Sequence, residues 1–201
     1  MDGAIARMKD IVISNLYKSY DNNCVLNDLS IVLKAGQITA LMAPSGAGKT
    51  TLLRILMNLE TADAGSIEGL DDSRISTVFQ EDRLCEQLNT IDNIRLVNTE
   101  NTRQDIIEAL KIVELDHAAY QKVSELSGGM RRRVSILRAL MSKYDLLLLD
   151  EPFRGLDAET KKIVMLDTLK RCEGKTVLLV THDSTELEVM GIQNCIHLPV
   201  Q

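Results

Sequence analysis

The chain contains a glycine-rich segment whose residue types suit the binding of a polyphosphate. The segment is Ala43-Pro44-Ser45-Gly46-Ala47-Gly48-Lys49-Thr50-Thr51. Glycines let successive backbone N–H groups surround phosphate oxygens at a helix N-terminus, and the lysine adds a compact positive charge. The hydroxyl of Thr50 comes directly after the lysine, where a hydroxyl binds Mg²⁺. We predict that the whole segment binds a nucleotide, with Lys49 also acting in catalysis and Thr50 at the metal.

The first position of this loop departs from the pattern G-x-x-x-x-G-K-[ST], because Ala43 replaces the glycine. An alanine adds strain there if the backbone needs a positive φ and is harmless if φ is negative, and the sequence leaves both open. The apolar run 38–42 and the apolar pattern of 52–56 predict the strand and the helix that must flank such a loop. A glycine-rich turn without a ligand is the alternative, and this flanking context argues against it.

Two adjacent carboxylates, Asp150 and Glu151, follow a run of four leucines at 146–149. An uninterrupted apolar run is typical of a strand buried on both faces of a parallel sheet. Ligands of such sheets bind beyond the carboxyl ends of the strands, so we expect both carboxylates beside the phosphate loop. Because side chains alternate along a strand, their roles can differ. We predict that Asp150 binds Mg²⁺ and that Glu151 is the general base for a water attacking the γ-phosphate. The alternative is that both merely end the strand.

Several further motifs resemble those of the ABC ATPases. The segment Leu126-Ser127-Gly128-Gly129-Met130 resembles the signature Leu-Ser-Gly-Gly-Gln, and from about residue 10 to its end the chain looks like the nucleotide-binding subunit of an ABC transporter. Met130 stands in place of the usual glutamine. It is similar to the Gly-Gly-Met version found in subunits of nitrate, sulfonate and taurine importers. The resemblance therefore indicates this importer subgroup.

The resemblance implies roles for residues at matching positions. Tyr20 matches the aromatic residue that stacks on adenine, and stacking of this kind tolerates any purine. Gln80 matches the glutamine of the Q-loop, where it would bind the metal or its water and act in catalysis. Asp157 lies in a segment that resembles the D-loop. His182 resembles the switch histidine, and an imidazole at that strand end can hydrogen-bond the γ-phosphate or orient the water.

The signature residues Ser127, Gly128 and Gly129 precede an amphipathic stretch at 131–141. They offer a hydroxyl and bare N–H groups at a helix N-terminus, which is a second anion site far from the first in sequence. In ABC proteins this site faces the γ-phosphate held by a second subunit. The resemblance therefore implies that two subunits, as a homodimer or heterodimer, sandwich two ATP molecules.

Apolar runs predict strands near 10–16, 25–33, 37–42, 75–79, 145–149, 175–181 and 194–198. Between 79 and 145 the patterns at 91–97 and 103–113 are helical, and Thr102-x-x-Asp105 resembles a capping box. We expect an α/β protein with an inserted α-helical subdomain. The resemblance implies a RecA-like P-loop NTPase core with an antiparallel β subdomain. The expected organisation is one ABC ATPase domain over 1–201, with the core at about 8–79 and 145–201 and the helical subdomain at about 80–144.

The charge and composition of the chain limit the kinds of partner that it is expected to bind. The chain of 201 residues has a net charge of −6, which argues against nucleic acid. The arginines at 131–133 and 138 are then expected to be surface charges or phosphate helpers. No apolar run approaches the roughly eighteen residues of a membrane span, and the first residues lack a signal-peptide core. We expect a cytoplasmic protein, which the resemblance places on the inner face of the cell membrane.

Two classes of function fit these observations. The favoured one is an ATP-binding and ATP-hydrolysing subunit of an ABC transporter that imports a small solute. Its partners would be a second ATPase subunit, transmembrane permease subunits docked near Arg83, Leu84 and Leu88, and a separate solute-binding protein. The rival is a soluble ABC ATPase that acts on a non-membrane partner, for example in cluster assembly. A subunit that binds ATP but barely hydrolyses it is a third interpretation, which the presence of Glu151 and His182 disfavours.

Overall fold

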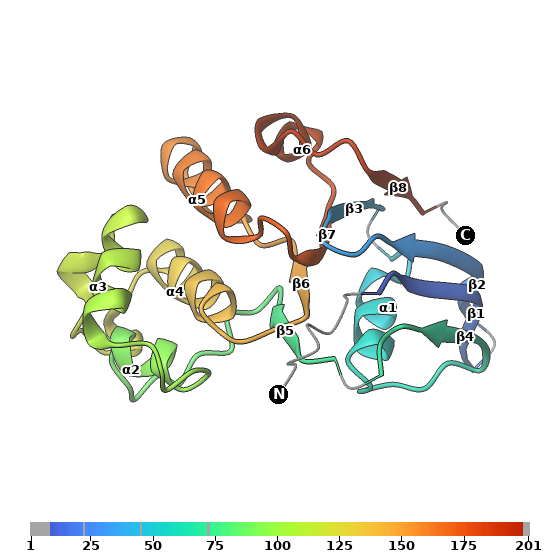
Figure 1. The fold of residues 1–201 in the computed structure, drawn as a ribbon, viewed down its shortest axis with the longest axis horizontal. Helices are drawn as coiled ribbons and strands as arrows, with labels where there is room; N and C mark the ends of the chain where they lie inside the picture. Colours follow the sequence, from blue (N-terminus) through green and yellow to red (C-terminus); the bar gives the residue numbers. More distant parts are fainter. Residues whose placement is uncertain (1–8, 22, 45, 72, 199–201) are drawn as a thin grey trace, which may run out of the picture.

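The computed structural model describes residues 9–21, 23–44, 46–71 and 73–198. The strands within these ranges form two sheets (Figure 1), a parallel sheet in the order β5-β6-β7-β3-β8 and an antiparallel sheet in the order β2-β1-β4. The parallel strands are β3 (Ile38–Met42), β5 (Ile75–Val78), β6 (Leu146–Asp150), β7 (Thr176–Thr181) and β8 (Cys195–His197). The antiparallel strands are β1 (Ile11–Tyr20), β2 (Asn23–Leu33) and β4 (Ala64–Glu68). The expected α/β class, with a parallel core and an antiparallel sheet, is confirmed.

Strands β6 and β7 form the centre of the parallel sheet and are buried at every position. Alternate residues of β6 enter different apolar clusters, Leu147 and Leu149 on one face and Leu146 and Leu148 on the other. Each face of the sheet is therefore covered by its own core. This explains why the sequence of β6 is uniformly apolar instead of alternating.

Six α-helices occur in the described ranges: α1 (Lys49–Leu56), α2 (Thr90–Arg95), α3 (Arg103–Ile112), α4 (Gly128–Leu140), α5 (Ala158–Arg171) and α6 (Ser184–Met190). Helices α2, α3 and α4 lie between β5 and β6 in the chain and together at one side of the parallel sheet (Figure 1). The predicted capping box at the start of α3 is confirmed, because Thr102 and Asp105 exchange side-chain-to-backbone hydrogen bonds. None of the helices in the described ranges has the length and apolar character to cross a bilayer.

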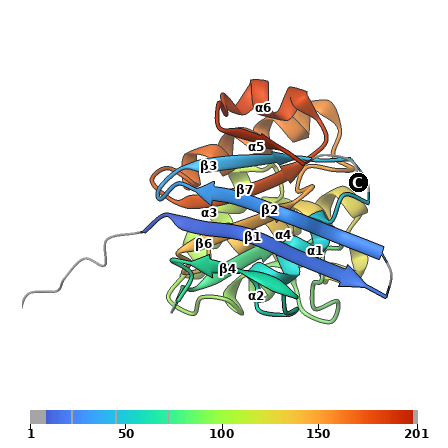
Figure 2. The ribbon, with the colours of Figure 1, turned by 90° about the vertical axis from the view of Figure 1, so that its right-hand side faces the viewer.

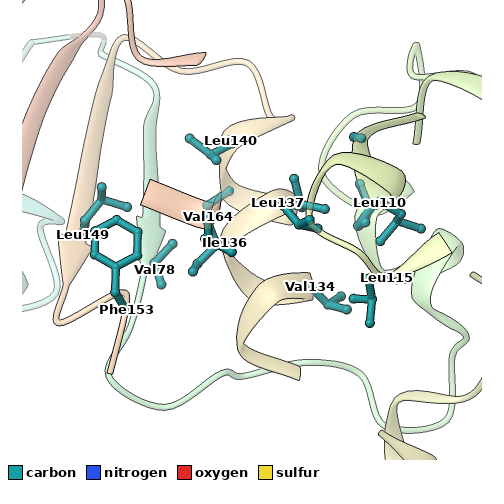
Figure 3. Close-up of a cluster of buried hydrophobic side chains, with 14 of the residues drawn as sticks. Val78, Leu110, Leu115, Val134, Ile136, Leu137, Leu140, Leu149, Phe153 and Val164 are labelled. Carbon is teal, nitrogen blue, oxygen red and sulfur yellow. The ribbon is translucent and has the colours of Figure 1, made fainter. Parts of the chain in front are cut away.

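Helix α4 joins these helices to the parallel sheet (Figure 3). Val134 and Leu137 lie on its side toward Leu115, whereas Ile136 lies on its side toward Phe153. All five of these side chains are no more than 1% exposed. A single helix thus contributes to the packing on both sides of the junction. Movement of the inserted helices relative to the sheet must therefore involve α4.

The antiparallel sheet is where the sequence was least informative. Figure 2 shows β1 between β2 and β4. Strand β4 was missed because it is short, contains Gly65 and is mostly exposed, so it has no apolar alternation. Strand β1 continues beyond its predicted end at residue 16 to Tyr20, through register shifts in its pairing with β2. Such irregular pairing interrupts the period-two pattern from which strands are predicted.

Candidate functional site

A cavity of about 670 Å³ opens at the carboxyl ends of β3 and β6, beside the N-terminus of α1. Most of the residues predicted from separate motifs line it together: Pro44, Gly46, Gly48, Lys49, Thr50, Thr51, Gln80, Asp150, Glu151 and His182. Val25 and Arg154, which the sequence did not single out, also line it. The expectation that ligands of a parallel sheet bind beyond its strand ends is consistent with this position.

The structure requires glycine at two positions of the loop, for different reasons. Gly46 and Gly48 adopt φ values of 84° and 82°, in the left-handed region that favours glycine. A Cβ on Gly46 would meet open space, whereas a Cβ on Gly48 would lie 2.6 Å from the carbonyl oxygen of Val25. Gly48 therefore also permits β2 to approach α1. Ser45, predicted to bind the nucleotide, lies outside the described residues.

Ala43 does not strain the loop. It is 5% exposed, packs in the apolar cluster beneath the loop, and is not among the described residues with positive φ. Of the two alternatives that the sequence left open, the structure therefore has the harmless one. Neither Ala43 nor Ala47 lines the cavity through its side chain. The carbonyl oxygens of Ala43 and Pro44 instead accept hydrogen bonds from Lys49 Nζ at 2.8 and 2.9 Å.

The carboxylate of Glu151 lies among three basic side chains. Its Oε1 is 3.2 Å from His182 Nδ1 and 4.0 Å from Lys49 Nζ, and its Oε2 is 3.5 Å from Arg154 Nη1. The Glu151 side chain is only 12% exposed. These neighbours hold the carboxylate at the cavity, which it lines, and a carboxylate placed there can accept a proton.

The backbone of Glu151 is strained. Its φ is 44°, which costs a non-glycine residue about 1–2 kcal/mol. The residue lies beyond the end of β6, and its N–H donates to the carbonyl of Val180 at 2.9 Å. Asp150 is therefore the last residue of the strand, whereas Glu151 belongs to the turn that follows it, and both line the cavity. Strand alternation therefore does not apply to this pair, and their different roles stay a prediction.

Asp150 is buried at the end of β6, with 7% of its surface exposed. Burial raises the pKa of its carboxyl above the ordinary value, and the neighbouring charge of Glu151 raises it further, while Lys49 and Arg132 lower it. Without a ligand, this ionised carboxylate is therefore destabilised. A cation bound beside it would remove that penalty.

Several predicted nucleotide-binding residues do not line the cavity. Tyr20 ends β1 with 41% of its surface exposed, and Lys18 Nζ lies 5.2 Å from its ring centroid. Ser127 caps α4 by accepting a hydrogen bond from the Met130 N–H, and Gly128 and Gly129 form the first turn of that helix. The signature is therefore separate from the phosphate loop within one chain.

The D-loop residues lie beside the signature and also outside the cavity. A Cβ on Gly129 would lie 3.7 Å from the side chain of Leu156. The carboxylate of Asp157 accepts a hydrogen bond from the Thr160 N–H at 3.0 Å and so caps α5. Within the described structure, the role of Asp157 is thus to begin a helix.

The arginines of α4 donate their hydrogen bonds to the main chain, and one of them was misinterpreted. Arg132 is 4% exposed, and its guanidinium bonds main-chain carbonyls at the junction of the helices and the sheet. Arg131, Arg133 and Arg138 also donate to main-chain carbonyls. The prediction of surface charges or phosphate helpers is wrong for Arg132. A signal existed, since residues 132, 136, 139 and 140 share the buried face of α4.

Comparison with known proteins identifies the family. The model of the family described as ABC transporter matches residues 26–154, well over half of the chain. The chain belongs to the ABC transporter family.

Three relatives illustrate the similarity. The aliphatic sulfonates import ATP-binding protein SsuB 1 of Rhodococcus jostii is 41% identical over 86% of this chain and 72% of its own. The sulfate/thiosulfate import ATP-binding protein CysA of Neisseria meningitidis is 39% identical, over 89% and 56% of the two chains. The spermidine/putrescine import ATP-binding protein PotA of Fusobacterium nucleatum is 35% identical, over 89% and 52%.

The chain spans about half the length of several curated relatives that it matches, including PotA. The expected resemblance to the sulfonate importer subgroup is confirmed by the similarity to SsuB 1. These relatives are named for different imported solutes.

Alanine substitutions at the two loop glycines should lower the stability of the protein by different amounts. We expect Gly46→Ala to lower the free energy of unfolding by about 1–2 kcal/mol, the cost of a left-handed alanine. Gly48→Ala should cost at least about twice as much, because its Cβ also collides with the Val25 carbonyl. Urea denaturation of the nucleotide-free protein measures both losses. Equal losses would mean that β2 does not restrict Gly48.

The buried carboxylate of Asp150 predicts a gain in stability from Asp150→Asn in the nucleotide-free protein. Its pKa is raised in the folded state, so its ionisation destabilises the fold as the pH rises through that pKa. The asparagine should therefore raise the free energy of unfolding at pH 8, and the gain should shrink as the pH falls toward 4.

Asp183→Asn is the matched control with the opposite sign. Hydrogen bonds from Lys161 and Thr185 lower the pKa of Asp183 to about 2. Its stabilising contribution is complete above the ordinary pKa and disappears only as the pH falls through about 2, so this variant should lose stability at pH 8. A loss of stability in Asp150→Asn as well would contradict the account of Asp150.

Proposed function

We propose that the chain is the ATP-binding and ATP-hydrolysing subunit of an ABC importer of a small solute. The observation that carries the proposal is the position of Glu151, whose carboxylate meets His182 and Lys49 in the cavity beside the phosphate loop. Family membership supports the binding of ATP. The site supports hydrolysis because it combines a phosphate cradle with a base at the same strand ends.

The residues that are present fit Mg²⁺. Thr50, Gln80 and the buried Asp150 offer oxygen ligands around one cavity, which is the ligand type that Mg²⁺ prefers. No group of three His, Cys, Asp or Glu side chains in the described part of the chain forms a metal cage. A site with few protein ligands suits an ion that is shared with phosphate oxygens. Bound there, Mg²⁺ would neutralise charge that develops on the phosphates during hydrolysis.

Each side chain at the cavity then has its own role in the proposed hydrolysis. Lys49 donates to two loop carbonyls and can transfer a hydrogen bond to a phosphate oxygen when ATP enters. Glu151 accepts the proton of the attacking water, because its carboxylate is held in the cavity by His182 and Lys49. His182 holds that carboxylate and is 63% exposed at its side chain, so it can also reach the γ-phosphate. Gln80 lines the same cavity and responds to the phosphate or metal.

The complete site requires a second ATPase subunit. Ser127, Gly128 and Gly129 do not line the cavity of their own chain, although they begin a helix of thirteen residues that can bind an anion. We infer that they complete the site of a partner subunit in an ATP-bound dimer, with the adjacent Asp157 segment at the interface. Tyr20 is proposed to stack on the adenine.

The proposal of further partners is supported by the relatives, which are named as import ATP-binding proteins. We propose transmembrane permease subunits and a separate solute-binding protein, with this chain on the cytoplasmic face of the membrane as a single ATPase domain. The segment around Arg83, Leu84 and Leu88 is the proposed dock. Arg83 is exposed and stacks its guanidinium 3.9 Å from the Phe79 ring centroid, next to the Gln80 segment. The relatives give no support to the soluble alternative.

Glu151→Gln should preserve ATP binding and lower kcat by about 10²–10⁴-fold, because it removes the base and keeps the shape of the side chain. Phosphate release measures turnover, and a fluorescent ATP analogue measures affinity. Glu159→Gln, an exposed position in the first turn of α5, should leave both unchanged. If the Glu151 variant retains turnover, another group accepts the proton.

A transporter subunit should co-purify with a membrane protein. We expect a tagged chain in its native host to recover a multi-span permease in stoichiometric amount after gentle solubilisation of membranes. Mass spectrometry of the purified complex identifies the partner and hence the system. Recovery only from the soluble fraction, with a soluble partner, would replace the importer proposal by the soluble ATPase.

A further inference from the structure

The guanidinium of Arg132 is the most heavily bonded polar group at the junction between the inserted helices and the parallel sheet. It donates to five main-chain carbonyls, those of Phe79, Gln80, Asp150, Glu151 and Pro152. It also forms an ion pair with Asp82, whose Oδ1 lies 3.3 Å from Nη1, and the carboxylates of Asp150 and Glu151 are further nearby charges. The first two carbonyls follow β5, and the other three belong to the end of β6 and the turn after it.

The donors of Arg132 divide between these two segments. Nη1 serves the segment after β5, reaching the Gln80 carbonyl at 3.3 Å. Nε and Nη2 serve the turn after β6, with Nε 2.6 Å from the Pro152 oxygen and Nη2 2.7 Å from the Glu151 oxygen. Because the guanidinium is rigid and planar, these bonds form together only when the two segments keep one relative placement.

Arg132 does not bind the nucleotide itself. Its side chain is 5% exposed and does not line the cavity, and all three of its nitrogens are engaged by the protein. Burial lowers the pKa of its guanidinium, and Asp82 is the largest of the groups that oppose this shift. Burying a charge is costly unless hydrogen bonds replace water. The carbonyls of Gln80 and Glu151 provide part of that replacement.

We propose that Arg132 is a positioning residue that holds the strained turn of Glu151 in register with the Gln80 segment. Glu151 has a φ of 44°, and the Arg132 bond to its carbonyl and the Val180 bond to its N–H hold that conformation from both sides. Displacement of Gln80 then displaces Glu151 through one side chain. This proposal rests on the proposed function, in which Glu151 is the base.

The test compares Arg132→Gln and Arg132→Lys with the wild type. Both variants should bind a fluorescent ATP analogue with a Kd within about threefold of wild type, while kcat falls at least about tenfold. Lysine keeps the charge and the long stem but lacks the fork, so it should not restore turnover. It also replaces the glutamine variant if that one fails to fold. Hydrogen–deuterium exchange should increase in the peptide 148–154 and stay unchanged in β7.

Arg74→Gln is the matched control. Arg74 comes just before β5 and its guanidinium donates to the carboxylate of Asp145, just before β6, so it links the amino ends of the same two strands, opposite the site. It should leave kcat and the exchange of 148–154 unchanged. A merely structural Arg132 would lose thermal stability in the variants with kcat retained, and that outcome overturns the proposal. A wild type without ATPase activity would instead overturn the proposed function.

Discussion

Everything at the site depends on the burial of β6 and β7 side by side, with both faces of the sheet covered. Apolar clusters hold alternate residues of the two strands on opposite faces, so neither strand can slide or turn without opening a core. Their parallel register pairs Asp150 with Val180, and it is the carbonyl of Val180 that accepts the Glu151 N–H. The positions of Asp150, Glu151 and His182 around one cavity therefore follow from the packing of residues that touch no ligand.

The site itself is held in an unfavourable state. Glu151 occupies the left-handed region, and Asp150 carries a carboxyl whose pKa is raised by burial. Lys49 uses its charge on two loop carbonyls and on Glu151. A cation beside Asp150 would reduce the cost of its ionised form, and phosphate oxygens would offer Lys49 a further partner. Charged groups confined in this way lower the stability of the fold, a cost that is common where activity requires such groups.

Helix α4 performs two tasks that link this site to the rest of the chain. Its N-terminus carries the signature, and its buried face joins the inserted helices to the sheet through Val134, Ile136 and Leu137. Arg132, on the same helix, bonds the backbone of both Gln80 and Glu151. One rigid element thereby carries the proposed partner site and bonds the backbone of the proposed phosphate-responsive segment and of the proposed base. This arrangement provides a physical route by which docking of a partner and hydrolysis can influence each other.

The sequence by itself determined the family, the strand and helix that flank the phosphate loop, and the strand that ends in Asp150, because all of these follow from short contiguous patterns. It also determined the α/β class, because apolar runs and capping signals depend on nearby residues. It could not determine β4 or the second half of β1, whose strands exist only through irregular pairing with each other and with β2. Likewise, only the tertiary structure decided that Ala43 is unstrained, that Glu151 lies in a left-handed turn, and that Arg132 is buried. Backbone conformation and the partners of a buried charge depend on segments distant in the chain, and no local pattern contains that information.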